Sequence, residues 1–188
     1  MHHTQQIDNI KWRYTRTGDR AGQPILFVHG FPLDHTMWTG QLNALTDVAE
    51  LIAVDLPGYG ESQRPDAQTG MAEFADQLAA FLDAINVDRV VMCGLSMGGY
   101  IAFEFADRHR DRVAGLVLSN TRASADDDVT ARGRHVAAAQ VMNEGAGPVA
   151  DAMRRAVDAI VVKVRSASSD PPELRPARRS RRLLRRRS

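Results

Sequence analysis

The sequence predicts an α/β protein in which helices flank a mainly parallel sheet. Four short apolar runs, at residues 25–28, 51–54, 90–93 and 116–118, are typical of strands that are covered on both faces. Helix-compatible segments separate these runs, and such alternation implies right-handed crossovers between parallel strands. Polar residues and glycines follow the runs. Because ligands bind beyond the carboxyl ends of the strands in parallel sheets, we expect a site at that edge.

One further strand and three helices complete the predicted core. Ile10, Trp12 and Tyr14 alternate with charged residues, which indicates a half-buried strand near the edge of the sheet. Segments 37–45 and 100–110 are compatible with helices. The clearest helix spans 71–85, where apolar residues recur at spacings of three and four; they are Met71, Phe74, Leu78, Phe81, Leu82 and Ile85.

The alternation stops at residue 123. Residues 129–142 and 148–164 are compatible with helices, and the acidic residues at 126–128 suit a helix N-terminus. Residues 165–188 are rich in arginine, serine and proline and have few apolar side chains, so this segment is predicted to be disordered by itself.

The net charge of +1 is divided unevenly along the chain. Residues 1–153 hold 12 basic against 20 acidic residues, whereas residues 154–188 hold 12 basic against 3 acidic ones. Eight arginines lie in 175–188, enough for salt-dependent binding of phosphates. No aromatic residue interleaves with them to stack on bases. We therefore interpret this tail as a solvated basic end and expect no nucleic-acid partner.

Cysteine content and hydropathy indicate the compartment. Cys93 is the single cysteine, so no intramolecular disulfide forms, which favours a reducing environment. The N-terminus shows no basic segment followed by an apolar core, and no window approaches eighteen apolar residues. The sequence predicts a cytoplasmic protein without a membrane segment.

The pattern Gly-x-Ser-x-Gly at residues 94–98 is the strongest indication of chemistry. It follows the apolar run 90–93 and precedes a predicted helix, which is the strand–turn–helix context of a nucleophilic serine. Ser96 would lie on a sharp turn, and the close approach of the backbone on both sides requires small residues at Gly94 and Gly98. The first turn of the following helix favours a developing negative charge.

Three motifs together resemble the α/β-hydrolase superfamily, in the family's order and spacing. They are His29-Gly30-Phe31-Pro32, Asp55-Leu56-Pro57-Gly58-Tyr59-Gly60-Glu61-Ser62 and Gly94-Leu95-Ser96-Met97-Gly98-Gly99. The chain is most similar to the small esterases and lactonases typified by 3-oxoadipate enol-lactonase. The resemblance divides the chain into the N-terminal part of a hydrolase core (1–123), a partial helical cap (124–164) and the arginine-rich tail (165–188).

The resemblance also implies roles for site residues. It assigns Ser96 as nucleophile and the backbone N–H groups of Phe31 and Met97 as the oxyanion hole, with His29, Gly30, Gly94 and Gly98 as supporting positions. His29 is expected to order its loop rather than to transfer protons. The implied chemistry uses no cofactor, and no metal site is predicted.

The triad acid and histidine of this family follow the serine, beyond later strands that the sequence does not indicate. His109 lies 13 residues after Ser96 along the same predicted helix, or roughly 20 Å away. His35 follows the oxyanion loop but has no base role in the motif, and His135 is expected on the surface of the cap. The acidic residues 126–128 offer an acid. We therefore expect a hydrolase core that is truncated before its last strands.

The predicted function is hydrolysis of a small-molecule ester or lactone through an acyl-enzyme on Ser96. One alternative is a non-catalytic hydrolase fragment that lacks the triad acid and histidine, and another is a binding module built on the basic tail. A sheet that lacks its last strands would also expose an unpaired edge, through which copies of the chain would associate.

Overall fold

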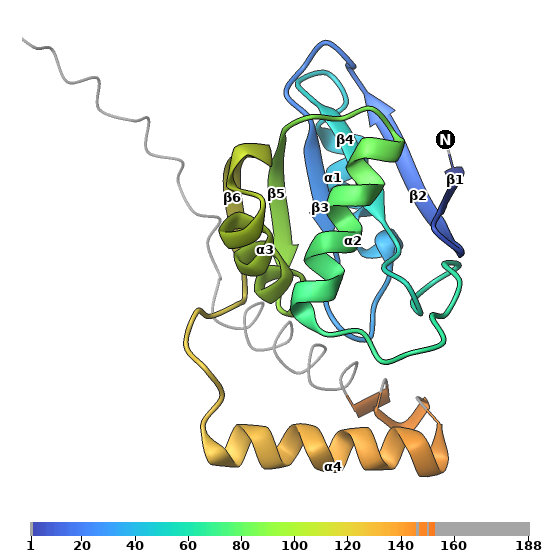
Figure 1. Cartoon of the computed structure of the whole chain (residues 1–188), viewed down its shortest axis with the longest axis vertical. Helices are drawn as coiled ribbons and strands as arrows, with labels where there is room; N and C mark the ends of the chain where they lie inside the picture. The colour runs from blue at the N-terminus through green and yellow to red at the C-terminus, as the bar shows by residue number, and fades with distance from the viewer. Residues whose placement is uncertain (1, 146, 150, 153–188) are drawn as a thin grey trace, which may run out of the picture. The chain divides into compact units, whose positions relative to one another are not determined.

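The computed structural model describes residues 2–145, 147–149 and 151–152 (Figure 1). The chain divides into two units, Met1–Ala125 and Asp126–Ser188. The first unit contains the sheet and both hydrophobic clusters, and it holds the chain segments on both sides of Ser96.

The first unit is built on a six-stranded sheet with the order β1-β2-β4-β3-β5-β6. Its strands are β1 (His2–Ile7), β2 (Ile10–Gly18), β3 (Ile25–Val28), β4 (Glu50–Val54), β5 (Val90–Leu95) and β6 (Val113–Ser119). Pairing is antiparallel between β1 and β2 and between β2 and β4, and it is parallel from β4 through β3 and β5 to β6. The mostly parallel α/β architecture predicted from the sequence is confirmed.

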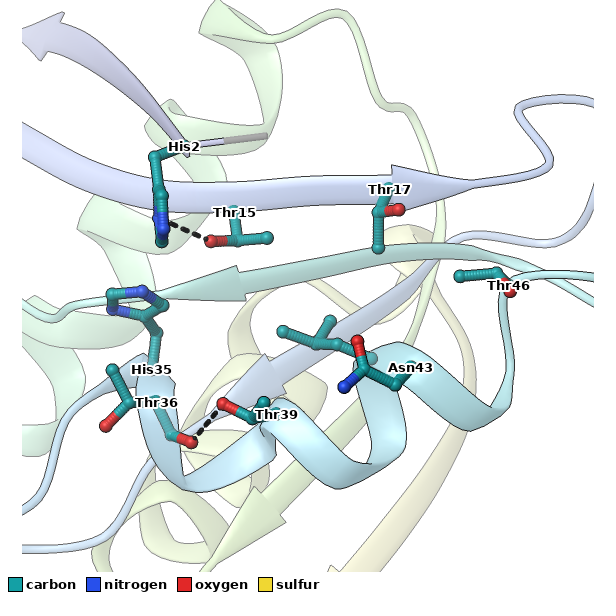
Figure 2. A pocket seen from close by; sticks show the side chains of 9 residues that line it. His2, Thr15, Thr17, His35, Thr36, Thr39, Asn43 and Thr46 are labelled. Atoms are coloured by element: carbon teal, nitrogen blue, oxygen red, sulfur yellow. Dashed lines mark hydrogen bonds between the residues drawn. The ribbon is translucent and has the colours of Figure 1, made fainter.

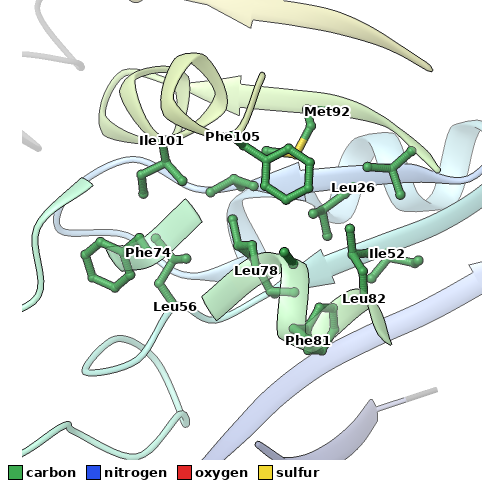
Figure 3. Packing of buried hydrophobic residues seen from close by; sticks show 14 of the residues in the cluster. Leu26, Ile52, Leu56, Phe74, Leu78, Phe81, Leu82, Met92, Ile101 and Phe105 are labelled. Atoms are coloured by element: carbon green, nitrogen blue, oxygen red, sulfur yellow. The ribbon is translucent and has the colours of Figure 1, made fainter. Parts of the chain in front are cut away.

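Two helices cover one face of the sheet, α2 (Met71–Ala84) and α3 (Met97–Arg108) (Figure 1). Alternate residues of β3 and β4, such as Leu26 and Ile52, point into this larger core, where the helices supply Leu78 and Phe105 (Figure 3). The helical spacing in 71–85 places one apolar stripe against the sheet, which is why this helix was readable from the sequence.

The opposite face carries a smaller core beneath η1 (His35–Trp38) and α1 (Thr39–Ala44). The intervening strand residues Phe27 and Leu51 pack there against Trp38 and Leu42. The central strands are therefore covered on both faces, as their continuous apolar runs indicate.

The sequence did not indicate β1. This segment pairs with β2 in register from His2 opposite Thr15 to Ile7 opposite Ile10. This strand is mostly polar and partly exposed, so it forms through backbone hydrogen bonds without the apolar pattern that reveals other strands.

The prediction of a buried strand at 116–118 is wrong about burial. A strand is present, but Leu116, Val117 and Leu118 are 40%, 50% and 41% exposed. Among the described residues, β6 pairs only with β5 and stands at the edge of the sheet. The short 3-10 helix η2 (Arg110–Arg112) leads into it from α3.

The described part of the second unit contains α4 (Asp128–Glu144). Its N-cap is Asp127, whose carboxylate accepts a hydrogen bond from the Thr130 N–H at 2.8 Å, as carboxylates at helix starts do. Residues 147–149 and 151–152 are helical, and the arginine-rich tail lies outside the described residues. No helix in the described part of the chain has the length and apolar character needed to cross a bilayer.

Replacing Phe81 with alanine should strongly destabilise the first unit. Phe81 is fully buried, and its ring stacks on Trp12 and meets Tyr14 edge-on, with centroids 5.2 and 5.1 Å away. The loss of this packing is expected to lower the free energy of unfolding by about 3–5 kcal/mol. Urea denaturation measures this change in the free energy of unfolding. Val48→Ala, at a position 68% exposed, is the control and should change stability by less than about 0.5 kcal/mol.

Asp76 on α2 should make stability depend on pH in the acid range. Its carboxylate accepts hydrogen bonds from the Arg108 guanidinium and from His109 Nε2 near the end of α3, and these contacts, that of Arg108 first, lower the pKa of Asp76 to about 2. Since an unfolded aspartate titrates at about 3.9, this stabilisation is complete above that pH and is lost as the pH falls through about 2.

Because the Asp76–Arg108 pair is largely exposed, its contribution should stay below about 1 kcal/mol. Unfolding of the wild type and of Asp76→Asn should differ most near neutral pH and converge at the acid end. A difference that stayed constant from neutral pH to pH 2 would contradict this account.

Candidate active site

Ser96 occupies a sharp turn between β5 and α3. Its φ is 50° and its ψ is −110°, a backbone conformation that costs free energy for a residue with a side chain. Hydrogen bonds hold this turn from two sides. The Ser96 N–H donates to the Ser119 carbonyl at 3.0 Å, and the Ser96 carbonyl accepts from the Thr121 hydroxyl at 3.0 Å and from the Gly99 N–H at 2.9 Å.

The two glycines of the Gly-x-Ser-x-Gly pattern are required by close backbone approach. A Cβ atom added to Gly94 would overlap the Gly98 carbonyl, and one added to Gly98 would overlap the Val28 carbonyl at the end of β3. Any larger residue would therefore push the start of α3 away from the sheet. The spacing that the sequence shows is thus imposed by the packing of the turn against β3.

The loop after β3 lies directly beside Ser96. A Cβ on Gly30 would be 3.4 Å from the Ser96 Cβ and 3.1 Å from the Leu95 carbonyl oxygen, so backbone meets backbone there. The N–H groups of Phe31 and Met97 donate to no other group among the described residues. Phe31 is 39% exposed, whereas Met97 is buried at the first position of α3.

Tyr59 joins these two loops. Its hydroxyl donates to the Met97 Sδ at 3.6 Å, and its ring meets those of Phe31 and His29 edge-on, with centroids 6.3 and 5.1 Å away. Burial raises the pKa of Tyr59, so its hydroxyl stays protonated and able to donate. In the sequence, Tyr59 is one residue of the 55–62 motif, and no pattern there predicts this role.

Comparison with known proteins places this architecture in a family. The family model described as alpha/beta hydrolase fold matches residues 23–167, which is more than half of the chain. The chain belongs to the α/β-hydrolase fold family. The match includes β3, β5 and the turn that holds Ser96.

The chain is similar to hydrolases of different kinds. An AB hydrolase superfamily protein of Bacillus subtilis is 38% identical over 106 residues, which are 55% of this chain and 40% of that protein. A thermophilic esterase from Thermogutta terrifontis has a TM-score of 0.73 and 40% identity, covering 81% of this chain and 57% of that structure. The enol-lactonase from Burkholderia xenovorans has a TM-score of 0.72 and 26% identity, covering 80% and 58%.

The chain therefore matches less than two thirds of the length of these hydrolase-fold proteins. The family match covers the strands from β3 to β6 and the Ser96 turn, and it assigns no substrate to this hydrolase-fold chain.

His29 has a structural contact in this hydrolase core. It is fully buried, with Nδ1 3.1 Å from the Gly30 carbonyl oxygen, and its Nε2 accepts the Leu56 N–H at 3.1 Å. Since Nε2 accepts, the proton of the neutral ring lies on Nδ1, which donates to Gly30. Burial lowers the pKa of His29 and favours this neutral form. The ring thus ties the β3 loop to the loop after β4.

No hydrogen bond joins a histidine to the Ser96 hydroxyl in the described part of the chain. His109, at the far end of α3, contacts Asp76, and His35 contacts Asp55. His2 and His3 lie on β1. His135 is exposed on α4, in the second unit.

A pocket lies apart from the Ser96 turn, on the side of the sheet covered by α1. Its volume is about 340 Å³, and its lining comes from the first two strands and the η1–α1 segment. None of the residues 29–31 or 94–98 lines it. This pocket was not predictable from the sequence, because the polar residues that line it come from separate segments that share no motif.

Replacing Gly98 with alanine should destabilise the hydrolase core. The new Cβ would overlap the Val28 carbonyl, and this backbone group cannot change rotamer as a side chain can. We therefore expect the free energy of unfolding to fall by about 1–3 kcal/mol. Gly133→Ala is the matched control. Gly133 lies inside α4, and a Cβ atom added to it has no neighbour within 4 Å. That exchange should be neutral or stabilising by up to about 1 kcal/mol. Equal effects of the two exchanges in urea denaturation would refute the packing argument.

Proposed function

We propose that this chain hydrolyses a small carboxylic ester or lactone through an acyl-enzyme on Ser96. The observation that carries the proposal is the strained Ser96 turn between β5 and α3, next to the unused N–H groups of Phe31 and Met97. Sharp turns of this kind present a serine hydroxyl at the end of a parallel sheet, where ligands bind.

The chemistry would proceed in two halves. The Ser96 Oγ attacks the carbonyl carbon of the substrate, its proton passes to solvent water, and the alcohol leaves after its oxygen takes a proton from water. For a lactone the leaving alcohol remains attached to the acyl group. Water then attacks the acyl-serine, releases the carboxylic acid and returns the proton to Ser96.

The negative charge of each tetrahedral intermediate would be stabilised by the backbone. The N–H groups of Phe31 and Met97 are fixed before the reaction by the packing of Gly30 against Leu95 and by the start of α3. One preorganised donor of this kind is worth roughly 3 kcal/mol of transition-state stabilisation. The N-terminal end of α3 adds a partial positive charge at the same place.

The two solved structures described above support an ester or lactone as the substrate class, since one is an esterase and the other an enol-lactonase. The proposal assigns the base to none of the six histidines. Turnover is therefore expected to rest on the oxyanion contacts and on substrate binding, which by themselves give roughly a thousandfold rate enhancement over water in serine hydrolases.

A fluorophosphonate probe tests this proposal directly. The probe phosphonylates a nucleophilic serine that lies beside oxyanion donors, so it should label the wild-type chain at Ser96 and fail to label Ser96→Ala. Ser119→Ala is the control, because Ser119 contributes only its carbonyl group to the turn, and labelling should be retained there. Mass spectrometry of the labelled peptide identifies the residue.

Ester hydrolysis measured on the same samples completes the test. Slow hydrolysis of a small aryl ester that disappears in Ser96→Ala supports the proposal. A well-folded wild-type chain that is neither labelled nor active would overturn it and favour the non-catalytic alternative.

A further inference from the structure

The pocket beside α1 contains a buried imidazole with an unused nitrogen. We propose that this pocket, named here the β1–α1 pocket, binds a transition-metal dication such as Zn²⁺ through the Nε2 atoms of His2 and His35. The site is separate from Ser96 and goes beyond the proposed hydrolysis. Its lining residues are His2, Thr15, Thr17, His35, Thr36, Thr39, Leu42, Asn43 and Thr46.

Asp55 fixes the orientation of His35. The Asp55 Oδ1 accepts from the His35 N–H at 2.8 Å and lies 2.7 Å from the His35 Nδ1, while its Oδ2 accepts from the Glu61 N–H at 2.9 Å. A carboxylate oxygen accepts, so Nδ1 carries the proton. In the neutral ring Nε2 therefore presents a lone pair.

That lone pair has no partner in the described part of the chain. His35 is only 5% exposed, and its Nε2 is buried without a hydrogen bond. Leaving a buried polar atom unpaired is unfavourable, so the arrangement is expected to have a ligand. A histidine that donates one ring N–H to a carboxylate and offers the other nitrogen to a metal is a common arrangement in metal sites.

His2 supplies the second nitrogen from β1. Its Nδ1 lies 3.1 Å from the Thr15 hydroxyl, which can accept a hydrogen bond from the Nδ1–H group, and this leaves Nε2 available. Figure 2 shows the His2 ring pointing from its strand toward the His35 ring at one end of the pocket. Each ring thus has its Nδ1 held by an oxygen, as ligands to a shared metal require.

The spacing of the two rings suits one metal ion. Their centroids are 5.5 Å apart and their planes are inclined by 80°. With Zn–N bonds of about 2.0–2.1 Å, each centroid would lie about 3.2 Å from the metal, and a tetrahedral pair would place the centroids about 5 Å apart. The observed centroid spacing is therefore close to that expected for two ligands of one ion.

The surroundings favour a hydrated cation. One carboxylate oxygen each from Asp34 and Asp55 and one ring nitrogen of His35 lie within 4.8 Å of one another, which places negative charge beside the His35 ring, although neither carboxylate lines the pocket. Both Asp55 oxygens already accept hydrogen bonds, so we assign Asp55 to orienting the ligand. The pocket volume of about 340 Å³ leaves room for water at the remaining positions. Imidazole ligands suit Zn²⁺, Cu²⁺ and Ni²⁺.

The test is isothermal titration of the full chain, first freed of metal with a chelator, with Zn²⁺ alone. The wild type should bind one equivalent. His2→Asn and His35→Gln should each weaken binding by at least tenfold, because each removes a ligand. The matched control is His3→Asn, the neighbouring histidine, whose ring instead stacks on Tyr14 with centroids 5.2 Å apart. Its affinity should stay within about twofold of the wild type.

His2→Asn is the decisive variant, because His2 is exposed and its loss should leave the fold intact. Circular dichroism of each variant verifies folding, and the Zn²⁺-induced rise in melting temperature gives a second readout. The proposal is overturned if the wild type binds no Zn²⁺, if His2→Asn binds as tightly as the wild type, or if His3→Asn loses as much affinity as His2→Asn.

Discussion

The contact between the β5–α3 turn and the end of β3 is the constraint on which the site depends. Gly98 lies against the Val28 carbonyl, and Gly30 lies against the side chain and carbonyl of Leu95 and the Ser96 Cβ, so neither glycine position has room for a side chain. This closeness forces Ser96 into its positive φ and brings the N–H groups of Phe31 and Met97 to the same edge of the sheet. The two cores hold the contact closed, because α3 packs through Ile101 and Phe105 on one face while Trp38 packs on the other.

The loop after β4 acts as a second layer of support. Its residue Asp55 is fully buried and accepts three hydrogen bonds, two from His35 and one from Glu61. The next residue, Leu56, donates to His29, and Tyr59 contacts both His29 and Met97. The same loop therefore holds His29 and Met97 near Ser96 and also holds His35 in the β1–α1 pocket.

Much of the core could be predicted because its signals are local. Continuous apolar runs mark β3, β4 and β5, and the helical spacing around Leu78 marks α2, since burial on both faces or on one stripe leaves a direct trace in the sequence. The Gly-x-Ser-x-Gly pattern is local only in part. Gly94 is required by the Gly98 carbonyl within the same turn, whereas Gly98 is required by the Val28 carbonyl of β3, which is distant in the sequence.

Features that depend on distant residues were not predictable. β1 forms from polar residues that pair through the backbone, and the apolar run at 116–118 gave no sign that β6 stands at an edge. Asp55 and His35 are 20 residues apart, and His2 reaches the pocket only through β1. No spacing rule links these three residues. The boundaries at 123 and 164 and the roles of Ser96, Phe31 and Met97 stay predictions.

The edge position of β6 has a consequence for the persistence of the Ser96 turn. Two of the hydrogen bonds that fix Ser96 come from Ser119 and Thr121, at the end of the strand that is paired on one side only among the described residues. Edge strands open locally at a lower free energy than central ones. Separation of β6 from β5 would remove these two hydrogen bonds, so the persistence of the Ser96 turn depends on the local stability of this edge pairing as well as on the global free energy of unfolding.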